Sequence, residues 1–580
     1  YLIIKGNIYL NIEEIENAIE CYQEVLKIDD KTEQAYINIG CAYANNNRPK
    51  DAIPFLEKAL QLNPKVASIY SNLGNAHYMM GNKEKSIEYF NKAEKLDPSL
   101  SGALSSKAAA YMDSGKSEAA IFTLIKSIQK DPYNSNAYIN LGILLRNKNC
   151  PEESAKWLKR GVTLLKSQPY KDKSIASALA NLGYAYLDLQ KFSEMKNCFE
   201  EAVKYDEDSE AVAGFYTYSK LFVADWNNLD HYKNLNLQKI SEEKNICTPF
   251  CSFSVTDELE TQKQAAVIYS NQRFKKVYRE KEYSFEKNYK HERPRVAYIS
   301  SDFYDHATMH LMVGLFENQN NKKFDYHAIS YTTKNDSNPI TKRVERAFQN
   351  FHHVGDKNNE QIAELINNLE IDIAVDLKGY TYGTRMDVLA HRPAPIQISY
   401  IGHPGTTGTK YIDYAIVDKF IVPENNDKFF TEKLIKLKGC YQATDNKRIL
   451  PKPLPRKDFG LPENKFIFCS FNNTYKIQPE MFNIWMDILN NKKDSILWLL
   501  DTEDIAKENL LKAAEDRGIN KERIIFSKKI TMTDHIQRQM CADIFLDTFP
   551  ICAHTTASDA LWVGLPLVTL SGKSMVSRVA

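Results

Sequence analysis

The chain has 580 residues, of which 43% are hydrophobic and 26% charged, a balance typical of a globular protein with roughly three or four domains. Its formal net charge of +1 gives no general attraction to nucleic acid or to an anionic membrane. No apolar run approaches the ~20 residues of a membrane span, and the ten cysteines lack zinc-site spacing. We therefore expect a cytoplasmic protein with reduced thiols and with neither nucleic acid nor membrane among its partners.

Residues 1–212 repeat one pattern every 34 residues. Small residues recur in register, and after an insertion at 167–173 the pattern resumes at Gly183; the earlier positions are Gly6, Gly40, Gly74, Ala108 and Gly142. Pro64, Pro98 and Pro132 keep the same interval near the unit ends. A helix pair with a 34-residue period is the signature of tetratricopeptide (TPR) repeats, so we predict an α-solenoid of six repeats.

A polar position lies two residues before most of the register glycines. It is occupied by Asn38, Asn72, Asn140 and Asn181, with Ser106 at the equivalent place before Ala108. This position should face the concave groove, where an Asn side chain can donate to and accept from the backbone of an extended polypeptide. The alternative is that Asn is merely tolerated on a solvated face; its recurrence favours an acceptor-binding ladder. The repeats also offer a surface for homodimerisation.

Residues 213–290 predict a helical junction and linker. Trp226 is expected to be a core residue that attaches the repeats to the next domain. The charged run at 275–295 is interpreted as a solvated helix and linker rather than a binding patch.

Residues 291–450 alternate strand and helix patterns. Strands are predicted at 295–300, 325–331, 371–377, 396–402 and 414–417. This alternation favours a parallel sheet with helices on both faces, whose ligands gather at the carboxyl ends of the strands. His306 and His310, one helical turn apart after the first strand, do not suggest zinc because no carboxylate ligand converges on them. After the fourth strand, Gly402, Pro404 and Gly405 predict a tight loop whose backbone can approach a ligand closely.

Residues 451–580 follow a Pro-rich bridge and again alternate, with apolar strands FIFCSF, SILWLL, RIIFS, DIFLD and LVTL. The run from Asp547 to Thr569 predicts strand, loop, helix and strand. Thr555 and Thr556 at the helix start would add two hydroxyls to free backbone N–H groups at the positive end of the helix dipole, which suits a phosphate. Asp559, one turn on, could accept hydrogen bonds from ribose hydroxyls. The alternative is that the threonines only cap a helix.

This last motif, H-T-T-x-x-D-x-L-W-x-G-x-P, closely resembles the nucleotide-sugar site of the TPR-containing protein O-GlcNAc transferases. Other motifs that resemble the family occur in order: S-S-D-F at 300–303, R-P-A-P-I-Q at 392–397, G-x-P-G-T-x-G at 402–408 and F-N-x-x-x-K-I at 471–477. The resemblance implies a GT-B catalytic region of two Rossmann-like halves. The acceptor side would be 291–450, and the donor side 451–580 would be incomplete at its C-terminus.

The resemblance also implies residue roles. Lys476 would neutralise charge on the leaving diphosphate, with a solvated lysine as the alternative, and His306 stands at the active-site His position, with a structural cap as the alternative. The remaining implied donor contacts are Asn473, His535 (which stacks on the base), His554, Thr555, Thr556, Asp559, Gly402, Pro404 and Gly405. Met532 replaces a family lysine that helps to bind uridine. Leu369 and Asp372 replace an Asp and a His of animal enzymes, so the role of that Asp is not carried over.

The expected function is inverting transfer of N-acetylglucosamine from UDP-GlcNAc to Ser/Thr hydroxyls of polypeptides held by the repeats. No cofactor or metal is expected, since residues 291–580 contain no D-x-D motif. The base is left open among His306, Asp376 and the donor phosphate acting through water. One alternative is a GDP-fucose O-fucosyltransferase, which His554 and Asp559 disfavour and the Asn472-Asn473 pair favours. The other is a repeat scaffold with an inactive or incomplete transferase domain.

Overall fold

The computed structural model describes the chain except residues 13, 169–172, 210, 275–276, 278–288 and 333–337. It divides into two compact units, Tyr1–Tyr205 and Asp206–Ala580. The centre of the insertion at 167–173 and most of the charged run at 275–295 lie outside the described residues.

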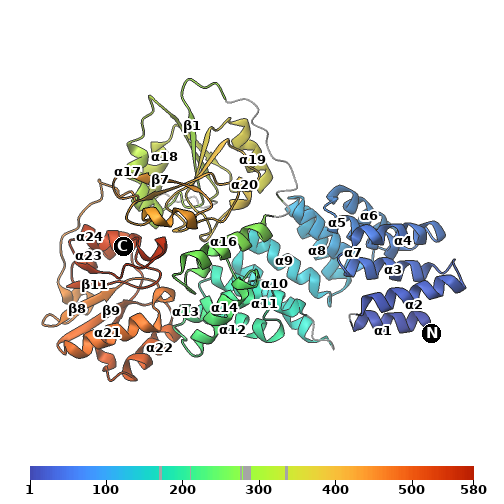
Figure 1. The fold of residues 1–580 in the computed structure, drawn as a ribbon, viewed down its shortest axis with the longest axis horizontal. Coiled ribbons are helices and arrows are strands. Elements are labelled where there is room, and N and C mark those ends of the chain that lie inside the picture. The colour runs from blue at the N-terminus through green and yellow to red at the C-terminus, as the bar shows by residue number, and fades with distance from the viewer. Residues whose placement is uncertain (13, 169–172, 210, 275–276, 278–288, 333–337) are drawn as a thin grey trace. The chain divides into compact units, whose positions relative to one another are not determined.

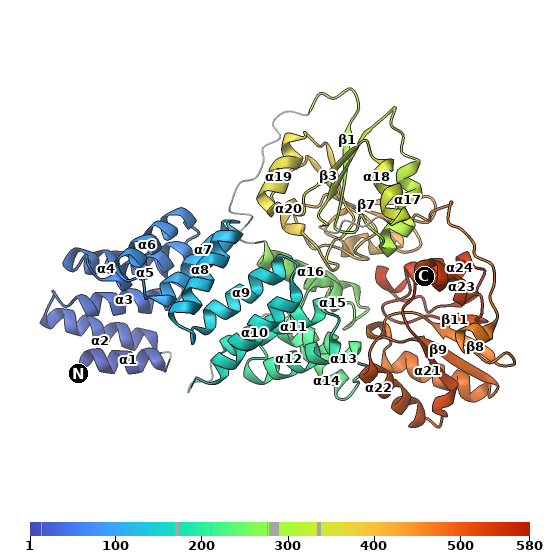
Figure 2. The ribbon, with the colours of Figure 1, turned by 180° about the vertical axis from the view of Figure 1, so that it is seen from behind.

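The first unit consists of six consecutive helix pairs (Figures 1 and 2). They are α1 (Leu2–Asn11) and α2 (Ile15–Ile28), α3 (Glu33–Asn45) and α4 (Pro49–Leu62), α5 (Ala67–Met79) and α6 (Lys83–Leu96), α7 (Ser101–Asp113) and α8 (Ser117–Lys130), α9 (Ser135–Asn147) and α10 (Pro151–Lys166), and α11 (Ser174–Asp188) and α12 (Phe192–Tyr205). The register glycines allow each pair to pack closely: a Cβ at Gly40 would lie 2.6 Å from Leu56 Cγ, and one at Gly74 would lie 2.7 Å from the Phe90 ring. Six helix pairs thus occupy residues 2–205, within the region 1–212 where the repeats were predicted.

The junction helices belong to the second unit. They are α13 (Val212–Phe222), α14 (Leu229–Ser241), α15 (Pro249–Ser252) and α16 (Leu259–Arg273). Trp226, in the turn between α13 and α14, packs against Phe482 with 5.3 Å between ring centroids. Trp226 therefore packs the junction that follows the repeats against the second half of the α/β region, residues 451–580.

A seven-stranded parallel sheet forms the first half of the α/β region, residues 291–450. Its strands are β1 (Arg295–Ser300), β2 (Asp325–Ser330), β3 (Asn350–His353), β4 (Ile373–Asp376), β5 (Ile396–Ser399), β6 (Tyr414–Asp418) and β7 (Lys433–Leu437), in the order 3-2-1-4-5-6-7. One face packs on α17 (Ala307–Glu317) and α18 (Pro339–Ala347), the other on α19 (Asn359–Asn368) and α20 (Met386–Ala390) (Figure 1). The five predicted strands are confirmed, while the two edge strands β3 and β7 were not predicted.

The second half of the α/β region is built on a smaller parallel sheet. Its strands are β8 (Phe466–Ser470), β9 (Ser495–Leu500), β10 (Ile524–Ser527), β11 (Ile544–Leu546) and β12 (Leu567–Val568), in the order 10-9-8-11-12. Helices α21 (Pro479–Asn491) and α22 (Asp504–Glu515) cover one face, while α23 (Met532–Gln539) and α24 (Thr555–Trp562) lie on the other side. Short 3-10 turns lie at Glu424–Phe429, Arg456–Phe459, Thr474–Lys476, Lys521–Arg523 and Met575–Ser577.

Both sheets reverse their strand order beside the first strand of the half, between β1 and β4 and between β8 and β11. In open parallel sheets, ligands bind in the crevice at the carboxyl ends of the two strands that flank such a switch point. The topology therefore predicts binding sites in the loops that follow these four strands.

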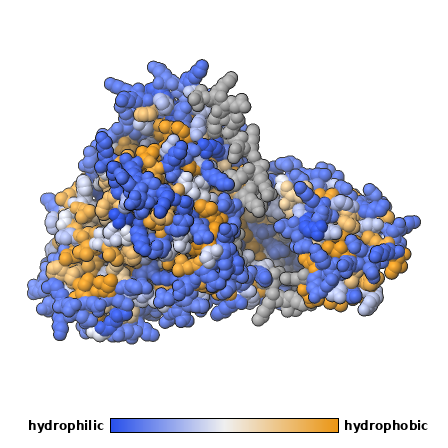
Figure 3. Space-filling view, viewed as in Figure 1, coloured by the Kyte–Doolittle hydropathy of each residue, from blue (hydrophilic) through white to orange (hydrophobic). Residues whose placement is uncertain are grey.

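No helix in the described part of the chain combines the length and apolar character needed to cross a bilayer. On the face shown in Figure 3, hydrophobic residues are interspersed with hydrophilic ones.

Candidate active site

The loops after β8 and β11 are joined by side-chain hydrogen bonds at the switch point of the second sheet. Asn472 donates through Nδ2 to Asp547 Oδ1 at 3.1 Å and to Thr548 Oγ1 at 2.9 Å. Its Oδ1 accepts from Thr556 Oγ1 at 2.7 Å, at the start of α24. A single buried amide thus fixes both loops to the first turn of α24.

Asp547 organises the loop between β11 and α24. Its Oδ1 accepts from the backbone N–H groups of Thr548 and Ala553, both at 2.7 Å, and its Oδ2 accepts from Thr569 Oγ1 at 2.7 Å. Burial raises the pKa of this carboxyl group. No role was predicted for Asp547, although a carboxylate directly after an apolar strand is a signal that could have suggested one.

Lys476 lies at the amino end of α24. Its Nζ donates to the backbone carbonyl of Cys552 at 2.9 Å, two residues before the N-cap of that helix. Burial lowers the pKa of Lys476. Among the described residues no carboxylate oxygen forms a direct ion pair with it, and the nearby Asp547 carboxylate opposes the effect of burial on its pKa. The solvated-lysine alternative is wrong, because the side chain is half-buried and bonded within the site.

Helix α24 begins without a side-chain cap. Its N-cap is His554, and no side-chain hydrogen bond caps the first turn. Thr555 and Thr556 are already helical, and the Thr556 hydroxyl donates to Asn472 instead. The alternative that these threonines only cap the helix is therefore wrong. Burial and nearby Lys476 lower the pKa of His554 to about 3, so its imidazole is neutral near pH 7 and the lysine is the cation at this helix end.

A second cluster surrounds His535 and Asp559. The His535 ring stands edge-on to Phe471 at 5.3 Å, and its Nδ1 accepts from Arg538 Nε at 3.1 Å. Burial lowers the pKa of His535 to about 3. Asp559 is only 2% exposed and forms an ion pair with Arg448, which belongs to the segment connecting the two halves. Sequence reasoning proposed the Asp559 carboxylate as a ligand for ribose but missed this partner.

In the first half, His306 is the N-cap of α17. Its Nδ1 accepts from the backbone N–H of Thr308 at 3.2 Å and lies 3.4 Å from Asp302 Oδ2. The capping role that the sequence left as an alternative is thus present, while the side chain stays 37% exposed. His310 is bonded separately to Asp305 at 2.7 Å. The described residues contain no cluster of three side chains able to hold a metal ion.

Asp376 is the last residue of β4, and Lys378 lies in the loop that follows it. The Asp376 carboxylate accepts from the backbone N–H groups of Lys378 at 3.3 Å and Gly379 at 2.5 Å, and burial raises its pKa to about 6. Lys378 forms a buried ion pair with Asp302 at 2.7 Å, across the switch point from the end of β1. The pair therefore joins the loop that carries His306 to the loop that directly follows Asp376.

The loop containing Gly402, Pro404 and Gly405 approaches the protein's own chain. A Cβ at Gly402 would lie 2.2 Å from Leu377 O, and one at Gly405 would lie 2.8 Å from the Phe253 ring. The glycines are thus required for internal packing, a reason that sequence reasoning did not give.

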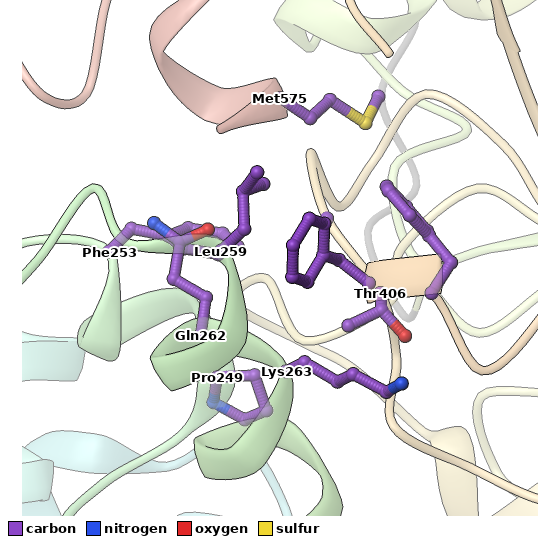
Figure 4. A pocket seen from close by; sticks show the side chains of 10 residues that line it. Pro249, Phe253, Leu259, Gln262, Lys263, Thr406 and Met575 are labelled. Carbon is purple, nitrogen blue, oxygen red and sulfur yellow. The ribbon is translucent and has the colours of Figure 1, made fainter. Parts of the chain in front are cut away.

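Beside Gly405, Figure 4 shows a narrow pocket between Phe253, Met575 and their neighbours. Its volume of about 10 Å³ holds about one water molecule, so it is too small for a nucleotide sugar.

Each of the four repeat asparagines lies on the first helix of its pair and is half-buried. Asn38 donates to Asn7 Oδ1 at 3.2 Å and Asn72 to Cys41 Sγ at 3.1 Å, both on the first helix of the preceding pair. Asn181 donates to Ser177 O at 2.9 Å within its own helix.

Asn473, in the second unit, is exposed at the start of the 3-10 turn that carries Lys476.

Comparison with known proteins identifies the family. The sequence profile of Glycosyl transferase family 41 matches residues 258–457 and 453–580, more than half of the chain. The chain belongs to this family. Profiles of tetratricopeptide repeats match 6–47, 33–66, 67–100 and 176–209 in the repeat region.

Relatives of the chain come from plants and animals. The chain is 39% identical over 295 residues to the probable UDP-N-acetylglucosamine–peptide N-acetylglucosaminyltransferase SEC of Arabidopsis thaliana, covering 50% of this chain and 30% of that protein. Its identity to the UDP-N-acetylglucosamine–peptide N-acetylglucosaminyltransferase of Caenorhabditis elegans is 26% over 406 residues, covering 50% and 35%. Its identity to the SPINDLY protein of A. thaliana, which carries the same probable activity in its name, is 29% over 295 residues, covering 48% and 31%. The chain spans about a third of the length of these relatives.

A solved structure shares the fold. A mutant of the Thermobaculum terrenum O-GlcNAc transferase matches with a TM-score of 0.58 and 23% identity, over 83% of this chain and 84% of that one. The expected fold class, TPR repeats followed by a GT-B catalytic region, is confirmed.

Proposed function

We propose that this chain carries the catalytic part of a protein O-glycosyltransferase that moves N-acetylglucosamine from UDP-GlcNAc to Ser/Thr hydroxyls. The observation that carries the proposal is the Lys476 ammonium group at the uncapped amino end of α24, with no carboxylate ion pair among the described residues. A cation and a helix dipole at one point favour a diphosphate anion. The names of the plant and nematode relatives support UDP-GlcNAc as the donor.

The reaction is a single displacement with inversion. The acceptor hydroxyl oxygen forms a bond to the anomeric carbon while the bond from that carbon to the diphosphate oxygen breaks, and the bonding electrons leave with UDP. Lys476 and the backbone N–H groups of α24 stabilise the negative charge that develops on the diphosphate. The hydroxyl proton passes to a base, for which His306, Asp376 and the donor phosphate through water are the candidates.

Lys476 and the helix dipole supply the positive charge in this scheme, and residues 291–580 contain no D-x-D motif. We therefore propose a reaction independent of metal and cofactor. The repeats would hold the acceptor polypeptide through Asn38, Asn72, Asn140 and Asn181. A cytoplasmic location agrees with ten free cysteines.

The test combines ligand binding with transfer. UDP should raise the melting temperature, because a ligand bound only by the folded state stabilises it. Stabilisation by GDP alone would instead support a fucosyltransferase. Transfer by the full-length protein, measured by mass spectrometry of acceptor proteins, should fall on the order of 100-fold or more in Lys476→Met, since removing one group that stabilises transition-state charge has this effect.

Lys465→Met is the matched control, because Lys465 lies in the same half, its side chain is 42% exposed and it pairs with Asp494 at 3.0 Å. Unchanged transfer by Lys476→Met would contradict the proposed role of Lys476, and absence of transfer by the wild-type protein would favour the scaffold alternative. Loss of turnover on chelation would contradict metal independence.

A further inference from the structure

Arg448 lies in the segment that connects the two catalytic halves, yet its side chain is buried in the second half. The side chain is 8% exposed. Its Nη2 forms the ion pair with Asp559 of α24 and lies 3.6 Å from Met532 Sδ at the start of α23. The guanidinium group thus packs between the two helices that carry His535 and Asp559.

One end of this guanidinium group is unsatisfied. Arg448 Nη1 is buried and has no hydrogen-bond partner among the described residues. Gln539 Oε1, on the side chain that contacts His535 at 3.1 Å, is also buried without a partner there. A buried charged N–H group without an acceptor is costly, so native structures rarely leave one unpaired. The two atoms indicate a polar ligand that completes this cluster.

The charges around the cluster specify which part of a nucleotide sugar fits. Asp559 balances Arg448, and the pKa of His535, lowered to about 3 by burial, keeps that ring neutral near pH 7. A phosphate would be repelled by the Asp559 carboxylate, and Lys476 with the amino end of α24 already offers it a site. Asp559 lies one helical turn beyond Thr556 on the same helix. The neutral nucleoside, which offers carbonyl oxygens and ribose hydroxyls, is the matching ligand.

We propose that Arg448 is a donor-binding residue that recognises the nucleoside of the nucleotide sugar, donating from Nη1 to a carbonyl oxygen of the base. The guanidinium group lies against Met532 and therefore supplies a positive charge beside an uncharged side chain. The inference deepens the proposed function and rests on it. If Arg448 binds the base, the segment that connects the two halves is part of the donor site, in addition to the loops of the second sheet.

Binding measurements on the full chain test the proposal, with UDP and inorganic pyrophosphate as probes in isothermal titration calorimetry. Arg448→Met should weaken UDP binding about 10-fold or more, the effect of losing a charged hydrogen bond, and leave pyrophosphate binding unchanged. Arg448→Lys keeps a charge for Asp559 but lacks the second N–H arm, so it should also weaken UDP binding selectively. Adding Met532→Lys to Arg448→Met should restore part of the affinity, because the new ammonium group would occupy the vacated space.

Lys447→Met is the matched control. Lys447 precedes Arg448 in the chain, is 60% exposed and pairs with Glu317 at 2.8 Å, so its loss should leave both affinities unchanged. UDP binding by Arg448→Met equal to that of the wild type would overturn the inference alone. An equal loss of UDP and pyrophosphate binding would also overturn it, since it would reveal a phosphate contact or a damaged fold. Failure of the wild-type protein to bind either UDP or GDP would overturn the proposed function itself.

Discussion

Asp302 and Lys378 form a buried ion pair that holds the two switch-point loops of the first half. Both side chains are less than a tenth exposed, and the Lys378 ammonium contacts both carboxylate oxygens, at 2.7 and 2.9 Å. Breaking such a pair on one side leaves a buried charge without its counter-charge. The stability of this half should therefore depend strongly on each partner.

We expect Lys378→Met to lower the free energy of unfolding by about 3–5 kcal/mol, measured by urea denaturation. Adding Asp302→Asn should recover part of the loss, because the unpaired charge is then removed. Lys419→Met is the control: the Lys419–Glu424 pair is 68% and 75% exposed, so its loss should cost about 1 kcal/mol or less. Similar losses in the two single variants would show that burial does not determine the effect.

His403 is another buried residue whose protonation should affect stability. Its ring stacks on Phe253 at 5.1 Å, its Nε2 lies 3.2 Å from Thr406 O, and burial lowers its pKa from 6.5 to about 4. A lowered histidine pKa means that the unfolded chain binds the proton first as the pH falls. Stability is thus fully present above about pH 6.5 and is lost as the pH falls toward about 4, by about 3 kcal/mol in all.

Urea denaturation midpoints at pH 7.5 and pH 5 measure this dependence. The difference between the two midpoints should shrink in His403→Gln, which keeps an amide able to donate to Thr406 O. The exposed His353, changed to Gln in the same way, should leave the difference as it is in the wild type. An unchanged difference in His403→Gln would show that other groups cause the acid sensitivity.

Sequence patterns predicted some site residues and missed others for physical reasons. Lys476 and Thr556 follow strand ends in the chain, where local order determines their place, and the structure brings both to the amino end of α24. Arg448 was missed because its place depends on how the connecting segment folds over α23 and α24, which no local pattern encodes. Asp559 was singled out from its place in the motif, but its ion pair with Arg448 depends on the same tertiary packing.

At the scale of elements, central strands were predictable and edge strands were not. β1 and β4 lie in the middle of the sheet with helices on both faces, and each contains a continuous apolar run, VAYI in β1 and IAV in β4. β3 has the sequence NFHH and β7 has KLIKL, and both lie at edges where one side of the ladder is unpaired. Short polar strands are common at edges because they discourage further pairing, and the same property makes them hard to recognise.

The register glycines of the repeats give a prediction about helix pairs. A Cβ at Gly74 would lie 2.7 Å from the Phe90 ring, which is buried in the same repeat. Gly74→Ala should therefore overpack the pair and lower the free energy of unfolding of the first unit by about 1–3 kcal/mol, measured by denaturation followed by circular dichroism. Phe90→Leu should relieve part of the loss in the double variant.

The control for this prediction is Gly102 in α7, where a Cβ would meet no atom within 4 Å. Gly102→Ala should leave stability unchanged or raise it slightly, since alanine has the higher helix propensity. Equal destabilisation at both positions would contradict the packing explanation.

At the scale of the whole molecule, the repeats and the catalytic region should contribute separately to activity. We expect Asn72→Ala with Asn140→Ala to raise KM for a long unfolded acceptor protein about 10-fold, because several backbone hydrogen bonds are lost. The KM for UDP-GlcNAc and the rate with a short acceptor peptide should not change. Steady-state kinetics with both acceptors checks this, and equal effects on the two would contradict an acceptor ladder.

The junction helices contact both catalytic halves through hydrogen bonds. Ser270 and Lys263 of α16 donate to the carbonyl groups of Gly408 and Lys428 in the first half, both at 2.7 Å. Just before α16, Asp257 accepts from Lys573 N at 2.7 Å and from Ser577 Oγ at 2.7 Å in the second half. Gln478, at the start of α21, donates to Ser254 O at 3.1 Å.

Through these contacts the junction segment holds the two halves together independently of the peptide segment that connects them. If the chain were cleaved in the Pro-rich stretch near Pro453, the C-terminal fragment would still be hydrogen-bonded to the junction segment of the N-terminal fragment. The two fragments should therefore co-purify. The protein is therefore a candidate for a split reporter, reassembled from two polypeptides that are expressed together.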